Sequence, residues 1–480
     1  MRWVSVGFVL VAVGVGCTKT NPILVCHNGQ CTDPQYRYCD VDGAIGGEPN
    51  TCVVPECTAN ELVTCDGSNA ITCNSDGNDY TTTACQFGCS LANGGCNQCA
   101  ANSATCSGSA VATCDASGVL HTEQCAGTCV DGQTPHCQYL SPKYLPDVCD
   151  NPGSGTLNWT QSADFDSDLD VNCNGGIVPQ AGGPAICVVR YSSISIADGA
   201  TLHVISSVNR DQSTSHPDDG RVIAFISDGD LVVAGTIDVS AQAQFSGPGG
   251  GLTRSGGNIA TGQAQGGAGF ATAGGNGGTT TTDGGANNGG QAALDPATLV
   301  TLLGGQRSGG GGGGAALLIS CRGSVKVTGW LTASGGGGPG GYHLFDGIAG
   351  GGGGGAGGYI VLEGLDVQVT GSVWSNGGGG GAGGNGTTGG STNEDGRDCS
   401  TGLFGTQGGG ARTGAGSGGA GGWINRIPQP GYHPSGSGGP GGGGGSIGFF
   451  QSYTPAGVTP TITPAAASPT FQPNASVSTR

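Results

Sequence analysis

The chain has 480 residues, of which 104 are glycine and only 10% are charged. Glutamate occurs six times and methionine once, so strong helix formers are scarce and a helical bundle is excluded. Thirty-three acidic residues against 15 basic ones give a net charge of -18, which excludes a nucleic-acid binder, because phosphate backbones are bound by clustered cations. The composition predicts an all-β chain with many turns and loops.

The N-terminus has the pattern of a secretory signal over residues 1–16. Arg2 precedes an uncharged apolar run, residues 3–15, which is shorter than the roughly 20 residues that span a membrane. The run Val-Gly-Cys that ends at Cys17 resembles a bacterial lipobox, whose cysteine is lipidated and becomes the mature N-terminus. Thr18 in place of Asp resembles lipoproteins sorted to the outer membrane. The resemblance implies a lipid anchor at the outer membrane or cell surface; the alternative is a soluble secreted protein.

Residues 57–140 contain two copies of one six-cysteine repeat. Corresponding cysteines lie 40 to 42 residues apart, and Gly-Ser at 67–68 recurs at 108–109. Each copy has too few large apolar side chains to bury a core, so disulfides formed in an oxidising compartment are expected to replace it. An alternative for Cys96 and Cys99 is half of a zinc site. The predicted disulfide cysteines of the repeats are Cys57, Cys65, Cys73, Cys85, Cys89, Cys96, Cys99, Cys106, Cys114, Cys125, Cys129 and Cys137.

Residues 17–56 form a smaller cysteine-rich module. Cys26, Cys31 and Cys39 resemble the middle of an EGF-like module, whereas Cys52 departs from that pattern. Four cysteines can form two bridges. Spacing alone does not determine the connectivity of any of these bridges. Together, the module and the repeats predict a stiff, protease-resistant stalk over residues 18–140.

The cysteines after residue 140 are widely spaced. Cys173 and Cys187 flank a Gly/Pro turn and are expected to pair. Cys321 and Cys399 are candidates for a further bridge, which would leave Cys149 over.

An acidic connector is predicted over residues 141–190. In an extended strand, its alternating aspartates would all face one way, and a hard divalent cation would relieve their repulsion. The pattern resembles the start of a calcium loop, although Gly175 stands where the bidentate Glu belongs. A solvated acidic face without a cofactor is the first expectation, and a calcium site is the alternative. The candidate ligands are Asp164, Asp166, Asp168 and Asp170.

Three segments of the remaining chain, 222–240, 316–334 and 358–376, align with one another. In each one apolar and polar residues alternate, which predicts strands with one face in a core. Repeated pairs of strands separated by loops are typical of stacked rungs. The sequence therefore predicts a Gly-rich parallel β-helix (solenoid) with long polyglycine loops over 191–453 and a Pro-rich tail over 454–480. A β-sandwich is the alternative.

The inserts between these segments carry most of the glycine: residues 247–448 contain 77 of the 104. Such tracts are either flexible linkers or extended, polyproline-II-like segments packed side by side. Several aromatic and histidine side chains lie in or beside them and are candidates for stacking on sugar rings or docking a partner; alternatively, they hold the loops on the solenoid. These residues are Tyr342, His343, Trp423, Tyr432 and His433. Trp330 and Trp374, in the strands, are expected to face opposite ways.

The succession of lipobox, cysteine repeats and glycine-rich rungs resembles uncharacterised cell-surface lipoproteins of the myxobacterial type. The glycine-rich part is also similar to the β-solenoids of bacterial and phage adhesins. The first resemblance implies no particular activity. The arrangement of anchor, stalk and glycine-rich solenoid predicts a non-catalytic structural or adhesive protein that contacts matrix, polysaccharide or a cell-surface protein. The alternative is a polysaccharide lyase or hydrolase, with Arg322, Lys326, Glu363 and Asp366 as its candidate residues, although no carboxylate pair recurs at matching outward positions.

Overall fold

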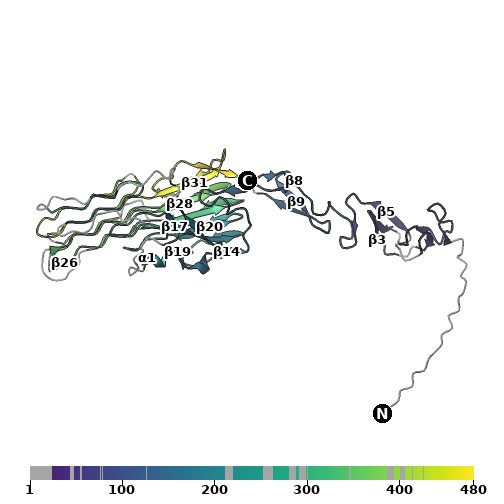
Figure 1. The fold of residues 1–480 in the computed structure, drawn as a ribbon, viewed down its shortest axis with the longest axis horizontal. Helices are drawn as coiled ribbons and strands as arrows, with labels where there is room; N and C mark the ends of the chain where they lie inside the picture. The colour runs from purple at the N-terminus through teal and green to yellow at the C-terminus, as the bar shows by residue number, and fades with distance from the viewer. Residues whose placement is uncertain are drawn as a thin grey trace, which may run out of the picture. The chain divides into compact units, whose positions relative to one another are not determined.

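The computed structural model describes residues 24–43, 48–54, 57–75, 77, 79–125, 127–210, 220–251, 263–280, 288–290, 299, 301–344, 347–385, 394–399, 406–412, 414–424 and 426–480. Contacts divide the chain into two compact units, Met1–Gln124 with Cys129–His136 and Cys125–Thr128 with Cys137–Arg480. The described residues are all-β apart from the short helical turns α1 (Ser207–Arg210) and η2 (Asp170–Asn172). The first unit holds the cysteine repeats, and the second holds the glycine-rich strands (Figure 1).

The first unit consists of short antiparallel strands, and its two repeats have the same topology. Each repeat has a three-stranded sheet followed by a two-stranded one. The first copy contains β3 (Leu62–Asp66), β4 (Asn69–Cys73), β5 (Tyr80–Ala84), β6 (Cys89–Ser90) and β7 (Gly95–Cys96). The second contains β8 (Ala104–Ser107), β9 (Ala110–Cys114), β10 (Leu120–Gln124), β11 (Cys129–Val130) and β12 (His136–Cys137). The preceding module pairs β1 (Tyr38–Asp40) with β2 (Thr51–Val53).

Disulfides join the same positions in both repeats: first to third, second to fifth and fourth to sixth. The bridges are Cys57–Cys73, Cys65–Cys89 and Cys85–Cys96 in the first copy, and Cys99–Cys114, Cys106–Cys129 and Cys125–Cys137 in the second. The shared connectivity confirms the two copies, and it removes the zinc alternative because Cys96 and Cys99 belong to different bridges. Few apolar side chains other than cysteine are buried there, so these cross-links stand in for a core.

The second unit contains three large sheets. The eight-stranded sheet has the order β13 (Leu140–Ser141), β34 (Ala475–Thr479), β31 (Phe449–Pro455), β28 (Tyr359–Glu363), β23 (Ala315–Ser320), β20 (Val222–Ser227), β17 (Gly183–Tyr191) and β16 (Ile177–Gln180). One six-stranded sheet has the order β14 (Thr156–Trp159), β18 (Ser193–Ile196), β21 (Leu231–Val233), β24 (Ser324–Val327), β29 (Asp366–Val369) and β32 (Thr461–Ile462). The other has the order β15 (Ala163–Asp166), β19 (Thr201–Ile205), β22 (Thr236–Asp238), β25 (Trp330–Thr332), β30 (Ser372–Trp374) and β33 (Ala466–Ser468).

Three consecutive strands, one in each sheet, form a three-strand unit that recurs along the chain. Each strand pairs in parallel with its counterpart in the next unit, as β21 does with β24 and β24 with β29. The predicted alignment is confirmed for the second and third strands of the units. For the first strand it is wrong by one or two residues. The alignment pairs residue 222 with 316 and 316 with 358, whereas in the structure Ile223 pairs with Ala316 and Ala315 pairs with Tyr359. The turn between the first and second strands differs in length from unit to unit. The spacing between repeats that is measured at the second strand is therefore not the spacing at the first strand.

Two hydrophobic clusters lie on opposite faces of the eight-stranded sheet. Strand β20 is buried along its whole length: Ile223 and Phe225 belong to the cluster shared with the six-stranded sheets, whereas Val222, Ala224 and Ile226 belong to the second cluster. The second cluster includes Leu140, Leu145 and other apolar residues of the segment that begins the unit, and this segment covers that face of the sheet. Strands buried on both faces read as continuous apolar runs, as β20 does.

The predicted connector and tail both contribute strands to these sheets. β14, β15 and β17 come from the chain before residue 191, and β32, β33 and β34 come from the Pro-rich segment. Their prolines lie mostly between strands, where no ladder hydrogen bond is lost. Phe449 and Phe450 lie in β31, which pairs with both β28 and β34 and is therefore not the last strand of the sheet.

The later cysteines pair in a way that the sequence left open. The predicted bridge Cys173–Cys187 is confirmed. Cys149 bonds to Cys321 across 172 residues, so Cys321 does not pair with Cys399, which keeps its thiol. The long bridge attaches the segment that covers the second cluster to the end of β23.

The described glycine tracts are packed and hydrogen bonded to one another. Residues 350–358 and 377–384 are all buried. Along residues 350–358, every third N–H donates to the same neighbouring tract. This spacing matches the three residues per turn of polyproline II. Donors Gly352, Gly355 and Gly358 reach the carbonyls of Pro339, Gly336 and Ala333, and donors Gly351, Gly354 and Gly357 reach those of Pro440, Gly443 and Ser446, all at 2.6 to 2.9 Å. The packed alternative therefore holds for these tracts, which run from the strands towards β26 (His343–Leu344) and β27 (Gly347–Ile348) (Figure 1).

Candidate functional site

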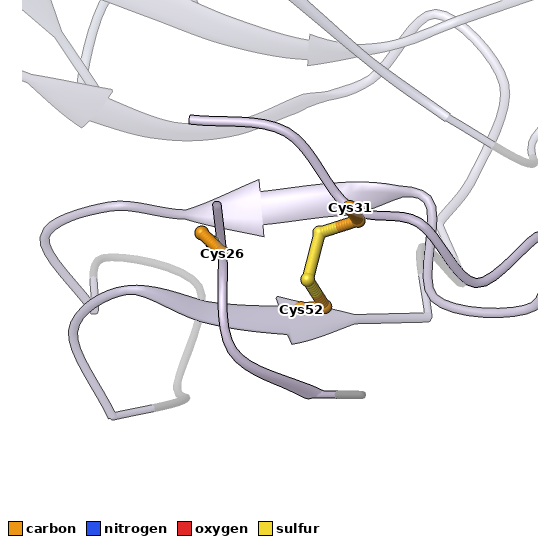
Figure 2. Close-up of side chains that lie close together, drawn as sticks. All are labelled: Cys26, Cys31 and Cys52. Atoms are coloured by element: carbon orange, nitrogen blue, oxygen red, sulfur yellow. A yellow bond between two sulfur atoms is a disulfide. The ribbon is translucent and has the colours of Figure 1, made fainter. Parts of the chain in front are cut away.

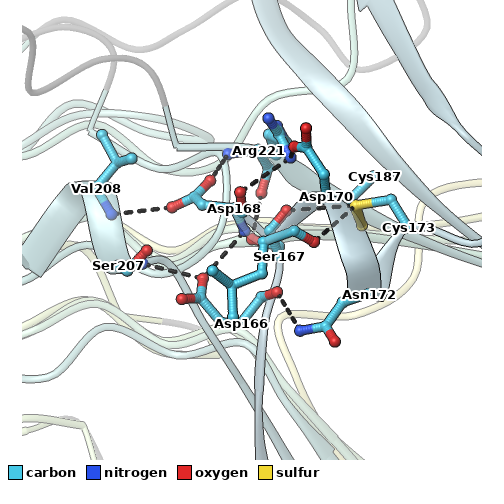
Figure 3. A network of polar contacts seen from close by, with 11 residues as sticks. Asp166, Ser167, Asp168, Asp170, Asn172, Cys173, Cys187, Ser207, Val208 and Arg221 are labelled. Atoms are coloured by element: carbon cyan, nitrogen blue, oxygen red, sulfur yellow. Dashed lines mark hydrogen bonds and ion pairs between the residues drawn. A yellow bond between two sulfur atoms is a disulfide. The ribbon is translucent and has the colours of Figure 1, made fainter.

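The four candidate calcium ligands do not form a ladder on one strand. β15 ends at Asp166, and Asp170 begins the turn η2. Asp168 accepts hydrogen bonds from Arg221 N at 2.8 Å and Val208 N at 3.0 Å (Figure 3). It also accepts one from Ser206 Oγ at 2.6 Å. Its carboxylate therefore holds together two chain segments that follow β19.

The other three aspartates have different partners. Asp166 Oδ1 accepts hydrogen bonds from Asp168 N at 3.0 Å and Ser207 N at 3.2 Å (Figure 3). Asp170 forms an ion pair of 2.7 Å with Arg221, and Asp164 lies 3.2 Å from His203. Protein donors thus neutralise much of the repulsion that a cation was expected to relieve, and calcium binding stays a prediction.

We expect Asp168→Ala to lower the free energy of unfolding by about 2 kcal/mol, because three donors lose a charged acceptor. Asp164→Ala is the matched control, since the Asp164 side chain is 65% exposed and contacts His203 rather than any of the three donors of Asp168. Urea unfolding of the full chain, with and without millimolar calcium, measures both effects. If both variants lose the same free energy of unfolding, and only when calcium is present, the two aspartates would instead share a cation site.

Three cysteines of the N-terminal module have sulfur atoms within 4.8 Å of one another: Cys26, Cys31 and Cys52. Cys31 bonds to Cys52 (Figure 2), and Cys26 bonds to Cys39. These are the two bridges that the sequence predicts. Because a metal binds thiolate and these sulfurs are oxidised, the cluster is structural.

Two candidate aromatic residues lie at the same end of the glycine tracts. Tyr342 is 48% exposed and Tyr432 is 58% exposed. A series of hydrogen bonds connects their tracts: Gly341 N to Ala382 O at 2.7 Å, Gly383 N to Gly416 O at 2.8 Å, and Tyr432 N to Ser417 O at 2.9 Å. Tyr342 directly precedes β26, which Figure 1 places at the far end of the tracts from the sheets.

The remaining aromatic candidates are not all gathered there. Trp423 follows Gly422, which accepts a hydrogen bond from Gly377 near the end of β30, and Arg426 stacks over its ring at 5.9 Å. The His433 ring lies 3.0 Å from Thr279 Oγ1. His343 belongs to β26, and its side chain is outside the described part of the structure.

The expectation that Trp330 and Trp374 face opposite ways is wrong. Trp374 pairs with Thr332, and Thr332 is two residues beyond Trp330, so both rings lie on the outer face of the sheet. Trp330 is 47% exposed and Trp374 is 5% exposed. The alignment was therefore wrong about the face on which Trp374 lies.

The residues of the enzymatic alternative do not converge. Glu363 is buried in the eight-stranded sheet, where its Oε2 accepts a hydrogen bond from Lys143 N at 2.8 Å. Burial raises the pKa of Glu363 to about 8, although the hydrogen bond and the charge of Lys143 lower it. Arg322 lies over the ring of Tyr139 at 5.6 Å. Lys326 and Asp366 line a common cavity, which neither Glu363 nor Arg322 lines.

That cavity has a volume of about 590 Å³ and lies at a corner between sheets. Lys326 forms an ion pair of 2.6 Å with Asp230, and Gln368 donates to Asp366 at 2.6 Å. Sequence reasoning missed Asp230 and Gln368 as site residues because they come from separate repeats. The register of β24 and β29 was the signal that places Lys326 beside Gln368.

No family model, curated protein or solved structure matches this chain. Across the described residues, no helix is both long and apolar enough to cross a bilayer. The predicted signal and the lipidation site Cys17 lie outside the described residues. The functional conclusion therefore depends on the geometry of this chain.

Proposed function

We propose that the protein is a non-catalytic surface lipoprotein that adheres to glycan, matrix or a cell-surface protein. The observation that carries this proposal is the pair of exposed rings, Tyr342 and Tyr432, at the same end of the packed glycine tracts. Tyrosine offers a large contact area with few rotatable bonds, so little entropy is lost when it binds. A rigid support lowers that loss further.

The second unit is proposed to be a Gly-rich parallel β-solenoid that supports these tracts. The parallel pairing of successive three-strand units favours this fold, since each unit covers the hydrogen-bonding edge of the one before. Antiparallel β13 and β16 lie at the two edges of the eight-stranded sheet, as end strands would.

The first unit is proposed to be a stalk, and Cys17 is proposed to carry the lipid that anchors it in the outer membrane. Ten disulfides in the described residues favour an extracytoplasmic location, because reducing compartments keep thiols reduced. The lipid itself is testable by mass spectrometry of the exported protein and of a Cys17→Ser variant.

The adhesive role is tested with residues 18–480, exported by an oxidising host and incubated with a panel of polysaccharides and whole cells, with and without calcium. We expect retention without new reducing or unsaturated ends. Tyr342→Ala with Tyr432→Ala should reduce retention at least tenfold, and Trp330→Ala, an exposed ring on a sheet face, is the matched control. Release of product would favour the polysaccharide-degrading alternative, and undiminished retention by the double variant would refute binding through these tyrosines.

A further inference from the structure

The cavity at the corner between sheets has the size and polarity of a ligand site. Its volume of about 590 Å³ lies within the range of small-molecule sites. Seven polar side chains line it. Thr128 and Gln138 come from the start of the unit, and the other five come from three successive three-strand units: Asp230, Ser324, Lys326, Asp366 and Gln368. Leu365, Pro455 and Val458 supply apolar surface. All of these residues belong to the second unit.

The register of two neighbouring strands places the polar groups on a regular grid. Ser324 pairs with Asp366, and Lys326 pairs with Gln368. Adjacent strands lie about 4.8 Å apart, and alternate residues on one strand lie about 7 Å apart. These spacings are comparable with those between the hydroxyl groups of neighbouring sugar units, so several hydroxyls can be contacted at once.

Part of the hydrogen-bonding capacity of these groups is used within the protein. Asp230 Oδ1 accepts from Ser324 N and Oγ, both at 2.8 Å, and its Oδ2 receives the Lys326 ammonium at 2.6 Å. Gln368 donates its amide to Asp366 Oδ2. The second carboxylate oxygen of Asp366, the amide oxygen of Gln368 and further protons of Lys326 remain to face a ligand.

The charges around the cavity disfavour ions of either sign. A metal cation would meet the ammonium of Lys326, and an anion would meet two carboxylates in a chain of net charge -18. A neutral hydroxyl group donates to Asp366 or Gln368 and accepts from Lys326. The C–H face of a sugar ring would lie on Leu365, Pro455 and Val458.

We infer that this cavity binds a segment of a neutral polysaccharide. The site is separate from the tyrosines of the proposed adhesive end and does not depend on them. Because uronic acid chains are anionic, the inferred ligand also differs from the substrate that a lyase would need.

The test is isothermal titration of the exported protein, with all disulfides formed, against four neutral hexasaccharides: cellohexaose, maltohexaose, laminarihexaose and mannohexaose. Hexagalacturonate is the anionic comparison. We expect saturable binding of at least one neutral sugar and at least tenfold weaker binding in Asp366→Ala and Gln368→Ala. Asn158→Ala, an exposed polar residue on β14 of the same sheet, should bind as the parent does.

Thermal melting shows whether each variant is folded, and Asp366→Asn, which keeps the shape of the side chain, repeats the test if Asp366→Ala unfolds. Absence of binding to all four neutral sugars, preference for hexagalacturonate, or unchanged binding in Asp366→Ala and Gln368→Ala would overturn the inference. The double tyrosine variant should still bind the soluble hexasaccharide. Its retention on polysaccharides and cells is compared in the Asp366→Ala background, where the cavity no longer contributes, so a failure of the adhesive role and a failure of this site are distinguishable.

Discussion

Replacing Gly355 with alanine is expected to lower the free energy of unfolding by about 3 kcal/mol or more, because the added methyl group has no space. A Cβ at this position would lie 1.8 Å from Gly311 O. The obstacle is backbone, so no side-chain rotation relieves it. Gly355 N also donates to Gly336 O at 2.9 Å, and Gly378 N donates to Gly355 O at 2.9 Å, so a shift of this tract disturbs its neighbours.

Gly229→Ala is the matched control in the same unit, since its Cβ would lie at an ordinary 3.5 Å from Ser192 O. Substituting alanine for glycine at an open position stabilises slightly through the unfolded chain, so the control should show no loss. Urea unfolding of both full-length variants with disulfides intact measures the difference. Equal stability of the two variants would show that the tracts do not pack as closely as their hydrogen bonds indicate.

Glu363→Gln is expected to remove a fall in stability between about pH 4 and pH 8. Burial raises the pKa of the Glu363 carboxyl in the fold to about 8, well above its value in an unfolded chain. The protonated form is therefore favoured in the fold. The stabilisation by the protonated carboxyl is fully present below the unfolded pKa and is lost as pH rises through the folded pKa, by about 5 kcal/mol in all.

The surroundings of Glu363 explain why ionisation is unfavourable. The hydroxyl groups of Tyr144 and Tyr359 lie 3.3 Å apart in the same cluster, and burial raises the pKa of both and of Tyr453. Lys143 is the cation that acts on the carboxylate, through its N–H and its charge. Glutamine keeps an acceptor for that N–H and carries no charge.

The measurement is the free energy of unfolding of the parent and the Gln variant at pH 4 and pH 9. The parent should lose about 5 kcal/mol more than the variant between these values. Glu394→Gln, at an exposed position, is the control and should follow the parent. A parent that loses no more stability than the Gln variant over this range would contradict the predicted burial of an uncharged carboxyl.

Much of the strand arrangement follows from local sequence. The two cysteine repeats and the second and third strands of the three-strand units were predicted correctly, because alternation and repeat spacing are visible over short windows. The register of β20 with β23 was not, since the corner between strands varies in length. The strands of residues 156–191 and 461–479 were not predicted. Aspartates in the first segment and prolines in the second interrupt the alternation of apolar and polar residues that indicates a strand.

The candidate sites show the same division. Tyr342 and Tyr432 were predicted as binding candidates from their glycine-rich surroundings and are exposed. Asp168 was expected to bind a cation, but its oxygens accept hydrogen bonds from segments about 40 to 50 residues further along the chain. The partnership of Lys326 with Asp230, 96 residues away, depends on strand register across two repeats.

The sequence by itself determined the all-β composition, the paired cysteine repeats and the alternation of the strands, because each is a property of neighbouring residues. Only the tertiary structure decided that Cys149 bonds to Cys321, that Glu363 is buried, and that the glycine tracts pack. A glycine tract has no side-chain pattern, and its neighbours are chosen by backbone approach and by hydrogen bonds at every third residue. Such contacts join distant parts of the chain, so no short window of sequence contains them.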